Sequence, residues 1–357
     1  MFDCAKDLLA FHDEKITLPD TERTAMRARR NANRDRVRKG LRENDEPLPW
    51  RFKSQGSYEM RTMIQHPAKD YDIDDGVYFR KSDLVGPQGG EISSLQARQM
   101  VRDAVDDGSF KTSPSCHKNC VRVHYDAGYH VDLPVYRTVT ETDIWGNETT
   151  YQELASSTWK RSDACDVTSW FDYANTAQSP DTTNGRQLRR ITREIKKFAR
   201  SRESWCAQIL SGFAITALVV ECYKPDLARE DRALHNTMKA IRDRLTYNLV
   251  IDHPCTAGVT ITSGADDAKA KFLRAKLTDA LTWLEPVFAQ DCTRAKALAA
   301  WDKFYCTDYF SLRASPVSEA ARAIGAPAIL SSGFLTESAT GAGIGAAVRK
   351  DGGGRYA

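Results

Sequence analysis

The sequence predicts an α+β fold in which a mixed α/β half is followed by a helical lobe. Alternating apolar residues between positions 121 and 135 are typical of strands, and helical periodicity dominates beyond about residue 180. The last segment is rich in Gly, Ala, Ser and Thr and has little apolar surface to bury. We therefore expect a core with an N-terminal helix over 1–180, a helical lobe over 181–330 and a flexible tail over 331–357.

The composition excludes several classes of protein. The 357 residues are 41% hydrophobic and 28% charged, which is enough apolar material for a core. A net charge of +3 is too small for a protein that coats nucleic acid, so we expect only a local basic site and no stable nucleic-acid partner. The nine cysteines are scattered, which favours reduced thiols in a cytoplasmic protein. Because no apolar run is long enough to cross a bilayer, we expect no membrane partner.

The first half divides into several elements. A highly charged helical segment occupies about the first 45 residues, and a loop, a short helix and a strand follow over 51–79. A further helix is expected over 95–107. Val121, Val123 and Tyr125 point one way, and the same alternation resumes after a Gly-containing turn. This pattern predicts a β-hairpin.

The second half is predicted to form helices that are separated by Pro and Gly residues. The first of them has an apolar stripe, and its other side gathers Arg189, Arg193, Lys196, Lys197 and Arg200. Such a basic side is either a solvated surface or a place where one or two cations reach a phosphate. The expected helices cover 186–202, 206–222, 232–248, 268–288 and 292–309.

Two features with chemical meaning occur in a fixed order near residue 60. Gly56 and Ser57 precede a predicted short helix, and a predicted strand with Asp72 and Asp74 follows. Residues two apart on a strand share one face, so the two carboxylates are presented together while Ile73 points into the core. Glycine lets the backbone approach a phosphate, and the serine hydroxyl and amide can hold phosphate oxygens.

A third carboxylate is expected on a neighbouring strand. Asp132 lies between the inward-pointing Val131 and Leu133, so it shares the opposite face with His130. Three carboxylates on adjacent strands are the ligands that Mg²⁺ prefers, and two such ions can stabilise the attacking and leaving oxygens in phosphoryl transfer. We therefore expect Asp72, Asp74 and Asp132 to be catalytic and metal-binding, with Mn²⁺ as an alternative ion.

Other interpretations of these residues remain open. A lone Asp-x-Asp is more often a solvated strand edge, and a glycosyltransferase also uses such a pair, although it needs neither Gly56-Ser57 nor Asp132. A non-catalytic nucleotide-binding module could keep the fold, although the three carboxylates argue against it. The cysteines and histidines over 116–124 form a dense group of soft ligands, but no second pair completes a zinc site.

The motifs resemble those of the cGAS/DncV-like nucleotidyltransferases (CD-NTases). GSYEMRT, DYDIDDGVYF and YHVDLPVYR are similar to the active-site motifs of this family, and the second is especially like the DncV subgroup of cyclic GMP-AMP synthases. LRRITREIKKFARSR resembles the family helix that ends in Leu-Lys-x-Trp, with Lys196 at the lysine and Phe198 in place of the tryptophan. LSGFAITALVVE resembles the segment in which a serine, here Ser211, precedes an apolar helix.

The resemblance implies a fold and an activity. The fold would be a polymerase-β-like nucleotidyltransferase core, a mixed sheet with flanking helices, whose active site faces the helical lobe across a cleft. The activity would be Mg²⁺-dependent joining of ATP and GTP into a cyclic dinucleotide, most simply cyclic GMP-AMP, with release of pyrophosphate. Gly56, Ser57, Lys196 and Ser211 would bind the triphosphate. A linear oligonucleotide, an RNA or small-molecule transferase, or a cyclic trinucleotide synthase are the alternatives.

The resemblance also implies partners. In bacterial anti-phage (CBASS) signalling, the product activates an effector, and an accessory enzyme with E1- and E2-like activities conjugates the synthase through its C-terminus. The chain ends GGGRYA, which gives reach and a low steric barrier near the last carboxylate. Ala357 is therefore the expected conjugation point, with an ordinary frayed end as the alternative.

Overall fold

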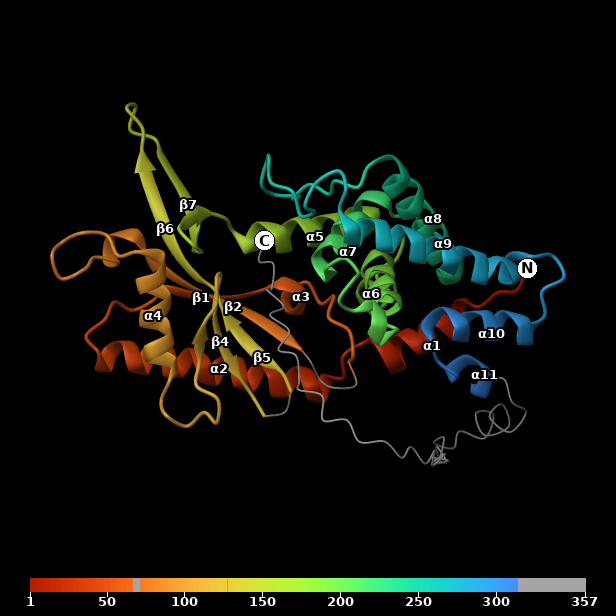
Figure 1. Cartoon of the computed structure of the whole chain (residues 1–357), viewed down its shortest axis with the longest axis horizontal. Helices are drawn as coiled ribbons and strands as arrows, with labels where there is room; N and C mark the ends of the chain where they lie inside the picture. The colour runs from red at the N-terminus through yellow and green to blue at the C-terminus, as the bar shows by residue number, and fades with distance from the viewer. Residues whose placement is uncertain (67–70, 127, 314–357) are drawn as a thin grey trace.

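A mixed β-sheet forms the centre of the N-terminal half. The computed structural model describes residues 1–66, 71–126 and 128–313, so the expected tail with Ala357 lies outside the described residues. Within the described residues the sheet has eight strands, and the α+β class expected from the sequence is confirmed (Figure 1). The strands are β1 Arg51–Gln55, β2 Asp72–Arg80, β3 Ser115–Cys116, β4 Val121–His124, β5 His130–Leu133, β6 Val135–Thr142, β7 Glu148–Ala155 and β8 Trp159–Arg161.

Strand β2 organises the sheet because it is paired along both edges. Asp74 pairs with Gln55 of the antiparallel strand β1 and also with Asp132 of the parallel strand β5. Strand β6 follows β5 after Pro134 and continues the parallel pairing with β2 from Val77 onward. The predicted hairpin of β4 and β5 is present and pairs β4 antiparallel to β5.

The two faces of β2 have different surroundings. Ile73, Val77 and Phe79 are fully buried in a core shared with α2 (Asp20–Glu43) and α4 (Ser94–Val105). Because side chains alternate along a strand, Asp72 and Asp74 project from the other face. The apolar alternation of β2 thus turns Asp72 and Asp74 away from the helices that cover the first face.

The helical lobe surrounds a separate core and includes the N-terminus. Phe2 donates its amide to Val287 at 2.9 Å, and Asp7 pairs with Arg294 at 3.1 Å. A helix long and apolar enough to cross a bilayer does not occur among the residues that the structure describes. The helices of this core are α1 Ala5–Phe11, α5 Ala164–Gln178, α6 Gln187–Ala199, α7 Gly212–Cys222, α8 Glu230–Tyr247, α9 Ala268–Phe288, α10 Arg294–Tyr305 and α11 Tyr309–Arg313.

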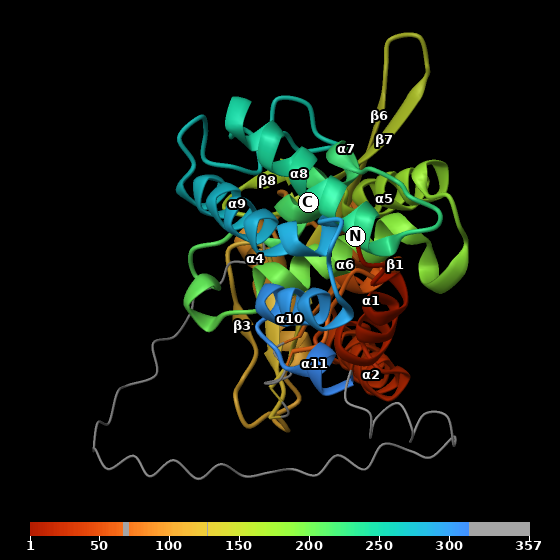
Figure 2. The same ribbon diagram turned by 90° about the vertical axis from the view of Figure 1, so that its right-hand side faces the viewer.

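Several elements differ from the expectations. Strands β6 and β7 form a long hairpin that stands clear of the body (Figure 1 and Figure 2), and no strand was predicted there beyond Val135. Helix α5 begins at an Asp163 cap within a segment with no predicted helix. Helix α7 begins at Gly212, rather than at residue 206, because the Ser211 hydroxyl accepts the amide of Ala214 and caps it.

Candidate active site

Three aspartates on two neighbouring strands form the centre of the candidate site. The parallel register of β2 and β5 places Asp72 opposite His130 and Asp74 opposite Asp132. Ile73 lies between Asp72 and Asp74 and is fully buried on the other face. The structure therefore gathers the three predicted carboxylates on one face of the sheet.

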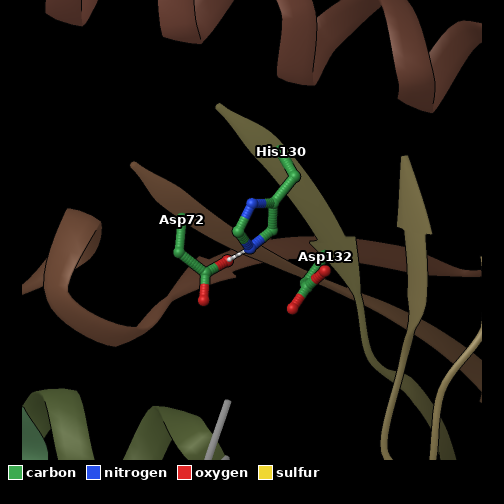
Figure 3. A group of neighbouring side chains, drawn as sticks. All are labelled: Asp72, His130 and Asp132. Carbon is green, nitrogen blue, oxygen red and sulfur yellow. Dashed lines mark ion pairs between the residues drawn. The ribbon is translucent and has the colours of Figure 1, made fainter. Parts of the chain in front are cut away.

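An imidazole joins two of these carboxylates at metal-ligand spacing. One ligand atom from each of Asp72, His130 and Asp132 lies within 4.8 Å of the others, and Figure 3 shows the ring of His130 directed at Asp72. Nε2 of His130 is 3.4 Å from Oδ1 of Asp72, which is too long for a good hydrogen bond, and this buried oxygen has no hydrogen-bond partner among the described residues. The soft-ligand group over 116–124 forms no comparable cluster within the described residues.

Burial and repulsion raise the pKa values of two aspartates. Burial is the main reason that the pKa of Asp74 lies well above its ordinary value, and the charges of Asp72 and Asp132 raise it further. Burial also raises the pKa of Asp72, which His130 partly offsets. For His130, burial alone would lower the pKa, but the Asp72 carboxylate raises it overall. The site thus holds crowded negative charge that a divalent cation would relieve.

Asp132 is held by an arginine from the adjacent strand. Nε of Arg122 donates to Oδ1 of Asp132 at 2.7 Å, and Nη2 of the same guanidinium donates to Oδ2 at 2.7 Å. The Asp132 side chain is fully buried, and the Arg122 side chain is 11% exposed. The two residues face each other because Arg122 and Asp132 are paired in the β4–β5 register.

Gly56 and Ser57 lie beside Asp72, Asp74 and Asp132, which together form the acidic cluster of the site. Gly56 begins the short helix α3 (Gly56–Glu59) with a φ of 65°, in the left-handed region that favours glycine. A Cβ atom at this position would overlap Oδ2 of Asp74. The absence of a side chain at Gly56 therefore allows the chain to pass close to the carboxylate.

A short hydrogen-bond network links Ser57 to Lys196 of the helical lobe, and Ser211 lies next to this lysine in the fold. The carbonyl of Ser57 accepts the amide of Thr62 at 2.9 Å, and Nζ of Lys196 donates to Oγ1 of Thr62 at 3.0 Å. A Cβ atom placed on Gly212 would lie 3.4 Å from Cε of Lys196, so the start of α7 and its cap Ser211 adjoin the lysine. Burial, followed by the charges of Arg200 and Arg193, lowers the pKa of Lys196 to about 7.

Part of the basic side of α6 is buried rather than solvated, whereas Arg200, directly after the helix, is exposed. Arg189 donates to the carbonyl of Met60 at 3.0 Å, and Arg193 donates to the carbonyl of Arg61 at 2.7 Å. Lys196 follows the same pattern one turn later and is buried. Helix α6 lies at the junction of the two halves, so its cations fasten the segment after α3 to the helical lobe.

A cationic hollow lies against the outer side of α3. Its volume is about 360 Å³, and none of the three aspartates lines it. Burial and the charges of Arg189, Arg23 and Arg61 lower the pKa of the neighbouring Arg193 to about 9. This is the local basic region that the small net charge permits. The lining residues are Arg23, Arg27, Arg30, Tyr58, Glu59, Arg61, Asp172 and Arg189.

Three residues of the site were not singled out from the sequence. His130 was available from the strand alternation, because it lies two positions before Asp132. Arg122 requires the cross-strand register, and Thr62 requires the packing of α3 on α6. Neither of the latter two positions carries a local sequence signal.

The chain is similar to known nucleotidyltransferases in sequence and in fold. Residues 50–136 match the family described as "Cyclic GMP-AMP synthase DncV-like, nucleotidyltransferase domain". This segment contains the paired strands β2 and β5, the Gly56-Ser57 turn and all three aspartates of the acidic cluster.

Solved structures share the fold over most of both chains. The Vibrio cholerae DncV cyclic AMP-GMP synthase, a prokaryotic cGAS homolog, has a TM-score of 0.66 at 16% identity and covers 85% of this chain and 96% of its own. The same enzyme with a linear intermediate, 5′ pppA(3′,5′)pG, has a TM-score of 0.62 at 16% identity and covers 82% and 91%. The 3′-deoxy GTP bound form of Escherichia coli DncV has a TM-score of 0.60 at 18% identity and covers 82% and 92%. At these identities the likeness establishes the fold.

Proposed function

Because residues 50–136 match a DncV-like nucleotidyltransferase domain, we propose that this protein joins purine nucleoside triphosphates into a cyclic dinucleotide, cyclic GMP-AMP. The observation that carries the proposal is the register of β2 and β5, which sets three carboxylates beside Gly56. ATP and GTP are the proposed substrates, in line with the GTP-derived ligand and the linear pppApG seen with solved relatives. Both products are released, the dinucleotide and pyrophosphate.

Asp72, Asp74 and Asp132 fit a divalent cation, Mg²⁺ or Mn²⁺, by chemistry and by spacing. Two of them share the 4.8 Å group with His130, and the third is crowded by both of the others. When bound, such a cation would lower the pKa of the attacking ribose hydroxyl and neutralise the leaving pyrophosphate. Oxygen donors of this kind favour hard cations over soft ones.

The other side chains bind and orient the triphosphate. Ser57 and Ser211 offer hydroxyl groups, and Lys196 offers a positive charge at the end of the Thr62 network. The ribose hydroxyl of one nucleotide attacks the α-phosphorus of the other, a new oxygen–phosphorus bond forms, and the bond to the β-phosphate breaks. The hydroxyl proton passes to solvent. A second such step, with the linear intermediate turned over, closes the ring.

Product analysis tests the proposed reaction. Incubation with all four nucleoside triphosphates and Mg²⁺, followed by mass spectrometry and nuclease digestion, is expected to yield pyrophosphate and a cyclic purine dinucleotide. A linear oligomer, a pyrimidine product or a trinucleotide would overturn the product assignment and leave the nucleotidyltransferase chemistry standing. If no nucleotide mixture releases pyrophosphate, the catalytic proposal itself is wrong.

Nucleotide affinity is expected to fall as the pH rises above about 7, because the pKa of Lys196 is about 7. A bound triphosphate stabilises the charged lysine and raises its pKa, so binding takes up a proton. Below pH 7 the lysine is already charged and affinity is flat. Above pH 7 affinity falls by up to about tenfold per pH unit until the pKa of the complex is reached.

Titration of a non-hydrolysable triphosphate between pH 6 and 9, in buffers of different ionisation enthalpy, measures both the affinity and the proton uptake. Lys196→Arg is the matched control, because its charge does not titrate in this range, and it should remove the pH dependence. Lys196→Ala should raise KM more than it lowers kcat. An unchanged pH slope in Lys196→Arg would show that another group titrates.

The wider role rests on the family resemblance. We propose a cytoplasmic enzyme of anti-phage (CBASS) signalling, whose cyclic product acts on an effector. Conjugation of the C-terminus at Ala357 by an enzyme with E1- and E2-like activities remains a prediction, and this residue lies outside the described part of the chain. Removal of the last few residues should abolish conjugation and leave synthesis intact.

A further inference from the structure

The Arg122–Asp132 pair is a costly arrangement for a purely structural purpose. Both oxygens of a fully buried carboxylate are engaged by one guanidinium at 2.7 Å each. Taking both charges out of water costs much of what their attraction returns, and an apolar pair of similar volume would often be at least as stable. The arginine also faces a residue of the acidic cluster, so its charge acts where a metal would bind.

Asp132 belongs to the candidate metal group while it is paired with Arg122. An ionised carboxylate has about four lone-pair sites, and the bidentate contact with Arg122 uses one on each oxygen. One Asp132 oxygen remains within 4.8 Å of the ligand atoms of Asp72 and His130. Because the two hydrogen bonds fix the plane of the carboxylate, the Asp132 side chain keeps one orientation before any cation arrives.

The same arginine changes the charge that an arriving cation meets. Three carboxylates attract the cation, whereas the fixed charge of Arg122, which is paired with Asp132, opposes it. Because these like charges would lie within a few ångströms of each other and away from bulk water, their repulsion weakens cation binding substantially. The triphosphate of a nucleotide brings the negative charge that restores the balance.

We propose that Arg122 is a positioning residue that holds Asp132 ready for the metal and makes stable metal loading depend on the bound triphosphate. This inference rests on the proposed function, because it assumes that the acidic cluster holds a divalent cation. It assigns to β4 a part in metal loading that neither the Asp-x-Asp motif nor the strand of Asp132 reveals.

Mn²⁺ binding to the full chain without nucleotide is the direct test, because free Mn²⁺ is counted by electron paramagnetic resonance without any turnover. Arg122→Gln is expected to bind Mn²⁺ about tenfold more tightly than the wild type. Adding a non-hydrolysable nucleoside triphosphate should tighten Mn²⁺ binding to the wild type by at least about tenfold and narrow the gap between the two proteins. The midpoint of thermal unfolding of Arg122→Gln should be low without metal and recover more with Mn²⁺ than that of the wild type.

A second buried bidentate pair provides the matched control. Arg190 contacts both oxygens of Glu230 at 2.7 and 2.9 Å in the helical lobe, and both side chains are less than 5% exposed. Arg190→Gln should lower stability in a similar way, but Mn²⁺ affinity and the response of its unfolding to Mn²⁺ should match the wild type. Equal behaviour of the two glutamine variants would show that Arg122 is only a structural ion-pair partner.

Arg122→Lys keeps the test decisive if Arg122→Gln does not fold. A lysine retains the charge but cannot make the two parallel contacts, so Mn²⁺ affinity should stay within about twofold while kcat falls about tenfold. An unchanged kcat would remove the positioning role.

Asp74→Asn distinguishes a failure of the metal site from a failure of the role of Arg122. If it binds Mn²⁺ as the wild type does, the metal site and the proposed function fail. If it abolishes a wild-type Mn²⁺ site while Arg122→Gln gains no affinity, only the role of Arg122 fails.

Discussion

Asp74→Asn is expected to lower turnover by about a thousandfold or more while raising the midpoint of thermal unfolding at neutral pH. Loss of one carboxylate charge from the acidic cluster should cost about 4 kcal/mol of transition-state stabilisation. The gain in stability follows from the raised pKa of Asp74, which burial and two neighbouring aspartates cause. A carboxyl group whose pKa is higher in the folded state destabilises the fold above its unfolded-state pKa, so removing its charge relieves that cost.

The adjacent residue is the control for Asp74→Asn. Asp75 points to the opposite face, is fully buried, and pairs with Arg34 and the hydroxyl of Ser54. Asp75→Asn should lower the free energy of unfolding by about 3 kcal/mol and leave turnover per folded molecule within about tenfold of the wild type. Thermal unfolding and pyrophosphate release under the same conditions measure both effects. The assignment of Asp74 fails if its variant retains turnover, or if it loses stability as Asp75→Asn does.

The opposite outcomes for two neighbouring aspartates depend on strand alternation, which is why the acidic face could be predicted from the sequence. Apolar residues fix which side of β2 and β5 is buried, and the carboxylates take the other side. The partner of Asp132 could not be predicted in this way. Whether Arg122 or a neighbour faces Asp132 depends on the exact register of β4 against β5, which a one-residue slip would change.

The projecting hairpin escaped prediction for a physical reason. Strands β6 and β7 beyond Val139 are exposed on both faces, so they carry no apolar alternation between polar residues. Ile144 and Trp145 at the tip are 90% and 82% exposed and resemble no core pattern. Strand periodicity reports burial on one face, and a ribbon that leaves the body has no buried face.

The basic helix shows a different limit of sequence reasoning. The apolar stripe of α6 is present, but three cations of its basic side donate to the carbonyls of residues 60–62, and Arg200 is exposed. An amphipathic pattern cannot distinguish a cation in water from a cation that donates to carbonyls of a distant segment. The same holds for α1, whose contacts with residues near 290 become visible only in the folded chain.

Gly56→Ala is expected to reduce kcat by about a hundredfold or more and to lower the free energy of unfolding by about 1–2 kcal/mol. The loss of stability comes from the left-handed φ of 65°, which costs a residue with a side chain about 1–2 kcal/mol. The larger effect comes from the added Cβ, which would overlap Oδ2 of Asp74 and displace the carboxylate. A shift of about 1 Å in a catalytic group can cost about a hundredfold in rate.

Gly40→Ala is the matched control because it also introduces a Cβ into a tight contact. At this position the methyl group would overlap the backbone oxygen of Ala104, between α2 and α4 and away from the acidic cluster. We expect Gly40→Ala to lose stability and to keep kcat per folded molecule near that of the wild type. Steady-state kinetics below the unfolding transition, combined with denaturant titration, separate the two quantities. If activity in Gly56→Ala falls only in proportion to its folded fraction, as in the control, then Gly56 serves the turn and not the catalytic carboxylate.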